Sequence, residues 1–138
     1  MKITWYGQSC FKFLVKANNG DKITIVIDPF SKDIGLTPPR GTADIVVVSH
    51  AHPDHNNVKS LSGEPYVIEG PGEYDVKKVF IRGIYSYHDD KKGEERGINT
   101  ISIIEAEDLN AIGSLVTNKV HPVPGVNRTV TCLAIKVT

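Results

Sequence analysis

A short apolar run, followed at once by a dense group of histidines, most limits what this chain can fold into. Residues 45–48 read Ile-Val-Val-Val, with Asp44 before them and Ser49 after them. A continuous β-branched run of this length indicates a strand buried on both faces, as in layered α/β folds. The segment 49–55 reads SHAHPDH and follows the strand without a spacer. We therefore expect titratable side chains to gather at the end of a buried strand.

The spacing of these histidines predicts a metal site. His50 and His52 are two positions apart, and side chains alternate in an extended segment, so both imidazoles should point to the same side. Pro53 then turns the chain and can bring Asp54 and His55 toward a neighbouring position. Imidazole and carboxylate together suit zinc, manganese or iron. Surface histidines are the alternative interpretation, but three of the chain's five lie within these six positions.

A third ligand has to come from elsewhere in the chain, because a catalytic zinc ion commonly has three protein ligands and one open position. His88 is the best candidate, since it follows an expected strand over residues 79–87 and precedes Asp89. Taken alone, without the first cluster, His88 would be interpreted as a solvent-exposed loop histidine. We expect His121, beside Pro122, to face solvent.

The first hundred or so residues are predicted to be rich in strands. We expect two short strands or a hairpin over residues 2–15 with a break at 7–9, and strands over 23–27, 66–68, 76–87 and 99–105. An irregular loop is expected over 31–42 and one or two helical turns over 56–61. Gly70, Pro71 and Gly72 are expected to form a tight turn. Neither a nucleophile elbow nor a P-loop occurs, which argues against a serine hydrolase or a nucleotide-binding protein.

Composition narrows the setting in which such a protein would work. The 138 residues are about one domain's worth, and 16 acidic residues balance 16 basic ones. The zero net charge disfavours nucleic acid or a membrane surface as a partner and leaves a small-molecule substrate. No leader-like segment opens the chain, and Cys10 and Cys132 fit a reduced compartment as small buried side chains. We expect a cytoplasmic protein.

Several segments together resemble a known family. Residues 50–55 match the His-x-His-x-Asp-His signature of the metallo-β-lactamase superfamily. The segments 5–11, 27–30, 69–74, 83–89 and 96–100 look like those of bacterial zinc-dependent hydrolases similar to the ascorbate-6-phosphate lactonases. The resemblance covers about residues 1–109. It implies an α/β fold, the four-layer αββα sandwich, of which this chain supplies the strand-rich N-terminal half.

The resemblance also implies roles for the candidate residues. His50, His52 and His88 would hold one ion, while Asp54 and His55 would hold a second. The ions would be Zn2+, or Mn2+ or Fe2+, and one of them would activate water for attack on an ester, lactone or phosphoester. Asp54 would orient that water or accept its proton.

The last stretch departs from the family pattern. All 16 acidic residues lie at or before Asp108, and residues 110–114 replace the family's His-Leu-Gly-Asp-like segment, whose Asp bridges the two ions. The tail, residues 110–138, could have this composition by chance, or it could be foreign to the fold through a frameshift, a deletion or a truncated gene. We expect an incomplete single domain that forms a homo-oligomer or aggregates and has little activity alone. The alternatives are a non-catalytic metal-binding remnant and a subunit completed by a partner chain.

Overall fold

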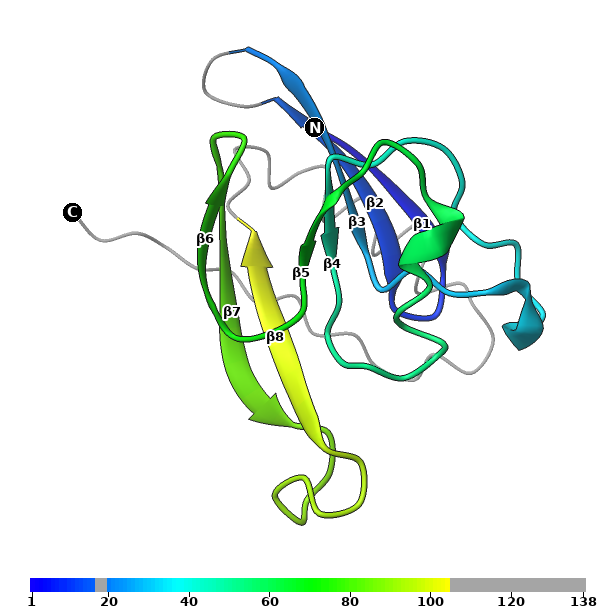
Figure 1. Ribbon diagram of the computed structural model, residues 1–138, viewed down its shortest axis with the longest axis vertical. Coiled ribbons are helices and arrows are strands. Elements are labelled where there is room, and N and C mark those ends of the chain that lie inside the picture. The colour runs from blue at the N-terminus through cyan, green and yellow to red at the C-terminus, as the bar shows by residue number, and fades with distance from the viewer. Residues whose placement is uncertain (17–19, 105–138) are drawn as a thin grey trace.

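The computed structural model describes residues 1–16 and 20–104, which form two β-sheets (Figure 1). The predictions for the acid-free tail, for His121 and for Cys132 concern residues outside these ranges. In the part of the chain that the structure describes, no helix is long and apolar enough to cross a membrane.

The larger sheet has five strands in sequence order. They are β1 (Lys2–Gly7), β2 (Cys10–Lys16), β3 (Lys22–Ile27), β4 (Ile45–Val47) and β5 (Tyr66–Ile68). β1, β2 and β3 pair antiparallel, whereas β3, β4 and β5 pair parallel. The predicted hairpin at the start of the chain and the strands at 23–27 and 66–68 are confirmed.

The smaller sheet has three antiparallel strands and was only partly predicted. They are β6 (Gly72–Val76), β7 (Val79–Tyr87) and β8 (Ile98–Ile104). The expectation of one strand over 76–87 was wrong at its start, because Val76 ends β6 and a two-residue turn follows. Lys77 and Lys78 form that turn with φ values of 52° and 65°, the left-handed conformation that closes tight hairpins. The strand β6 is short and begins at Gly72, within the segment that was expected to form a tight turn, with Glu73 and Asp75 exposed.

Strand β4 is buried on both faces, as its sequence predicted. Ile45 and Val47 are at most 1% exposed and pack in one core cluster with Ile81 of β7, between the two sheets. Val46 and Val48 belong to a second cluster on the opposite face of the larger sheet. Strand β4 therefore ends between two layers of packed side chains.

Among residues 1–16 and 20–104, loops with short 3-10 turns lie over the second face of the larger sheet. The expected irregular segment 31–42 contains one 3-10 turn, η1 (Lys32–Ile34), and the helical turn expected over 56–61 is η2 (Val58–Ser60). Phe30 is fully buried beneath these loops, and Asn57 donates from its side chain to the Phe30 carbonyl at 3.1 Å. This contact holds the end of the histidine-bearing loop against the residues that follow β3.

Cys10 is buried as predicted and should be chemically inert in the folded chain. Burial, and secondarily the negative charge of Asp28, raises the pKa of the Cys10 thiol to about 12. Since the thiolate is the reactive form, we expect iodoacetamide at pH 8 to leave Cys10 unmodified until the chain is unfolded. Mass spectrometry of the peptide that contains Cys10 measures this. Equal modification in native buffer and in urea would contradict the burial of this thiol.

Candidate metal centre

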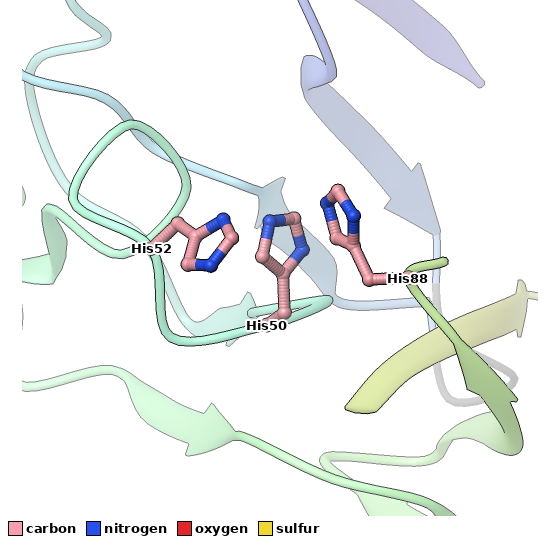
Figure 2. Close-up of side chains that lie close together, drawn as sticks. All are labelled: His50, His52 and His88. Carbon is pink, nitrogen blue, oxygen red and sulfur yellow. The ribbon is translucent and has the colours of Figure 1, made fainter. Parts of the chain in front are cut away.

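His50, His52 and His88 meet at one end of the two sheets (Figure 2). One nitrogen from each ring lies within 4.8 Å of the others. The ring of His50 stands between the other two, with its centroid 4.5 Å from that of His52 and 4.3 Å from that of His88. His50 and His52 face the same side, as their spacing predicted, and the structure brings His88 to them. Three nitrogens at this separation can share one ion.

Backbone hydrogen bonds explain why the loop after β4 and the end of β7 meet. The amide of Val48 donates to the Ile68 carbonyl at 2.8 Å, which continues the parallel pairing up to the first histidine. The amide of Thr100, in β8, donates to the Ser49 carbonyl at 2.8 Å and so joins the smaller sheet to the histidine loop. Because β7 pairs with β8, this bond also places His88 over the loop.

Two ring nitrogens of the triad are buried and lack hydrogen-bond partners. They are Nε2 of His50 and Nδ1 of His88. Buried polar atoms are nearly always paired, and an unpaired one costs on the order of 1–3 kcal/mol. A divalent cation accepts lone pairs from neutral imidazoles and would remove this cost at both atoms. The donor set therefore fits a metal ion.

The surroundings of His50 keep its ring neutral. Burial lowers the pKa of His50, and the positive charges that His55, His88 and His52 would carry lower it further. The neutral ring is the form that binds a metal ion, whereas a protonated ring would have no lone pair to offer. The cluster is thus biased toward the ligand form at neutral pH.

Asp54 and His55 lie beside the triad as a separate pair. His55 Nε2 is 3.6 Å from Asp54 Oδ2, and the ring centroid of His55 is 4.1 Å from that of His50. Gln8, in the β1–β2 turn, donates to Asp54 Oδ2 at 2.6 Å and lies 3.4 Å from His55 Nε2. Burial opposes ionisation of Asp54, but the Gln8 hydrogen bond and the nearby histidines outweigh it and lower the pKa of this carboxyl. Asp54 is therefore an anion at the edge of the site.

A buried carboxylate, Asp28, lies beneath the histidines. It follows β3, is 3% exposed, and has a φ of 45°, a strained backbone conformation that Asp tolerates better than most residues. Its side chain accepts from the Ser49 amide at 2.7 Å and the Ser49 hydroxyl at 2.8 Å. It also lies 3.1 Å from His55 Nδ1. One carboxylate therefore organises both the histidine loop and His55.

The sequence analysis did not identify Asp28, Ser49 or Gln8 as site residues. Asp28 and Gln8 appeared only within the segments 27–30 and 5–11 that resemble the family, and Ser49 only as the end of the apolar run. Asp28 carries one local signal, an acidic residue directly after a buried strand and before a proline. Their contacts with the histidine loop span many residues, so no local pattern could assign the partners.

Replacing Asp28 by asparagine should destabilise the fold. Three donors converge on this carboxylate, and an amide would turn an NH2 group toward at least one of them. We expect the free energy of unfolding to fall by about 1–3 kcal/mol, as for other broken buried polar networks. Urea unfolding measures it, with Asp75→Asn on the exposed edge strand as the control that should stay within about 0.5 kcal/mol. Equal unfolding midpoints for Asp28→Asn and the native chain would contradict the role of Asp28.

His50, His55 and His88 border an open cavity of about 380 Å³, a size that suits a small molecule. Its walls come from β7 and β8 of the smaller sheet and from loops that follow strands of the larger one. The lining residues are Ser9, Asp28, Ser49, His50, His55, Tyr87, His88, Asn99 and Thr100.

The fold and this centre together define the class of protein. Residues 2–112 match the beta-lactamase superfamily domain, and the chain belongs to that family. A UPF0173 metal-dependent hydrolase of Methanoculleus marisnigri is 46% identical over 75 residues, which are 54% of this chain and 30% of that protein. A Thermotoga maritima structure, described as a Zn-dependent hydrolase of the metallo-beta-lactamase superfamily, is 36% identical with a TM-score of 0.54. The match covers 76% of this chain and 44% of that one.

These matches confirm the expected superfamily and its strand-rich fold. The chain spans less than half of the length of either relative. The two sheets described above are thus one part of the metallo-β-lactamase sandwich, the part that carries the His-x-His-x-Asp-His segment and His88.

Proposed function

We propose that this chain is a metal-dependent hydrolase in which His50, His52 and His88 hold a zinc ion. The observation that carries the proposal is the convergence of these three rings, two of which bury a nitrogen that has no other partner. Manganese and iron suit the same donors. When bound, such an ion acts as a Lewis acid and lowers the pKa of a coordinated water toward neutrality.

The other residues of the site have separate tasks in this proposal. Asp54 is ionised, partly exposed and beside His52, so it can orient the attacking water or accept its proton. His55, with Asp54, is the pair that would hold a second ion. The pair lies 3.6 Å apart and needs further ligands to close a site. The cavity admits a small substrate with an ester, lactone or phosphoester bond.

Metal analysis of the purified chain tests the first part of this proposal. We expect about one zinc ion per chain after equilibration with zinc and removal of the excess. The measurement needs circular dichroism alongside it, so that a strand-rich fold is established before the metal is counted. A well-folded preparation that holds no metal and takes up no added zinc would overturn the proposal.

A second candidate is a metal-binding chain that needs a partner chain for hydrolysis. Ile84 and Ile101 favour it, because they pair across β7 and β8 on one face and are 43% and 53% exposed. Apolar residues in such a patch promote association. Turnover of p-nitrophenyl acetate, bis-p-nitrophenyl phosphate and a simple lactone by the zinc-loaded chain distinguishes the two. Zinc uptake without turnover on any of them favours the second candidate.

A further inference from the structure

Ser49 lies between the buried carboxylate of Asp28 and the first ring of the triad. Its hydroxyl oxygen is 2.8 Å from Asp28 Oδ2 and 2.9 Å from Nδ1 of His50. Its own amide donates to the other carboxylate oxygen at 2.7 Å. The backbone on either side is fixed as well, since the Ser49 carbonyl accepts from the Thr100 amide. The hydrogen bonds of the Ser49 amide and of the Ser49 carbonyl thus hold the residue, and with it the hydroxyl, in place.

The hydrogens available at these atoms allow one pattern of donors and acceptors among Asp28, Ser49 and His50. A carboxylate can only accept, so the single Ser49 hydroxyl hydrogen has to point at Asp28. The hydroxyl oxygen can then only accept from His50, which places the ring hydrogen of His50 on Nδ1. In the reverse assignment two oxygens 2.8 Å apart would face each other without a hydrogen between them.

We propose that Ser49 is a positioning residue that fixes the tautomer of the His50 ring. Because its hydroxyl donates to Asp28, it can only accept from His50. With its hydrogen on Nδ1, His50 has its lone pair on Nε2. That atom is the buried nitrogen of His50 without a partner. The ring therefore keeps a free lone pair on a buried nitrogen in advance of any ion.

The same carboxylate acts directly on a second ring. Asp28 Oδ2 lies 3.1 Å from Nδ1 of His55, which by the same reasoning carries a hydrogen and leaves Nε2 free to accept. Asp28 thus sets two rings, one through Ser49 and one without it. This difference supplies an internal control, because losing the Ser49 hydroxyl should alter His50 and leave His55 unchanged.

The tautomer is tested in the metal-free full-length chain, uniformly labelled with 15N. Long-range 1H–15N correlation spectra distinguish a protonated from an unprotonated ring nitrogen, and a His50→Gln variant assigns the His50 signals. We expect the hydrogen on Nδ1 in the native chain and in Ser49→Thr, which keeps the hydroxyl. In Ser49→Ala we expect a mixture of tautomers at His50 and the native pattern at His55.

Zinc titration adds a second measurement, and this arm alone rests on the proposed function. Loss of a partner behind a metal ligand commonly costs 10–100-fold in affinity, so we expect about that loss in Ser49→Ala and near-native affinity in Ser49→Thr. Finding Nδ1 of His50 unprotonated in the native chain would overturn the proposed role of Ser49. The spectrum of the native chain is sufficient for this test, even if Ser49→Ala does not fold. An unchanged tautomer in a folded Ser49→Ala would overturn it too. Absence of zinc binding in the native chain overturns the proposed function instead.

Discussion

Removing the third histidine is expected to abolish the metal centre. In His88→Ala only two of the three converging nitrogens remain, and both come from the same loop. Removing a hydrogen-bond partner of a metal ligand commonly lowers metal affinity by about 10–100-fold. Loss of the ligand itself should therefore weaken zinc binding by more than about a hundredfold. Competition against a chromophoric chelator measures this affinity. The apo fold should persist, because His88 lies at the edge of the cavity and not in either core cluster.

Asp90→Ala is the matched control for this variant. Asp90 is exposed and lies in the same loop, two positions beyond the histidine, so the substitution changes the loop without touching the triad. We expect native zinc affinity in this control. If His88→Ala bound zinc as tightly as Asp90→Ala, His88 would not be a ligand, and the ion would have to be held by some other group of the site.

Replacing Asp54 by asparagine is expected to separate hydrolysis from metal binding. The change keeps the shape of the side chain, and its amide oxygen can still accept from Gln8, so the loop should stay in place. It removes the negative charge that would accept a proton from the attacking water. We expect a rate lower by about a hundredfold, a usual size for a lost general base, with zinc bound by the triad as in the native chain.

The comparison requires a substrate that the native, zinc-loaded chain hydrolyses, and initial rates measured at equal zinc occupancy. Asp75→Asn, an exposed carboxylate of β6, provides the control for a loss of charge elsewhere on the surface. Equal turnover by Asp54→Asn and the native chain would show that another group takes the proton. A loss of zinc together with activity would instead make Asp54 a ligand of the first ion.

Predictions from sequence succeeded where neighbouring residues act on each other. The run 45–48 indicated a strand buried on both faces, and every residue of β4 is buried. The spacing of His50 and His52 indicated rings on one side, and their centroids are 4.5 Å apart. The alternation of side chains along an extended backbone, which contiguous residues share, explains the burial of the strand. The chain bends at residues 49–51, so the two rings meet through this bend and not through an extended backbone. The edge strand β6 was missed because it is short and begins at Gly72, within a segment whose Gly70, Pro71 and Gly72 indicate a turn.

The sequence by itself determined the family, the buried strand β4 and the two histidines that follow it, because each depends on residues close together in the chain. Only the tertiary structure decided that His88 joins them, that Gln8 holds Asp54, and that Asp28 lies behind Ser49 and His55. These contacts link segments on different strands and on two different sheets. Their physical origin is the packing of the sheets through Val47 and Ile81 and the Thr100–Ser49 hydrogen bond, neither of which a local pattern can express.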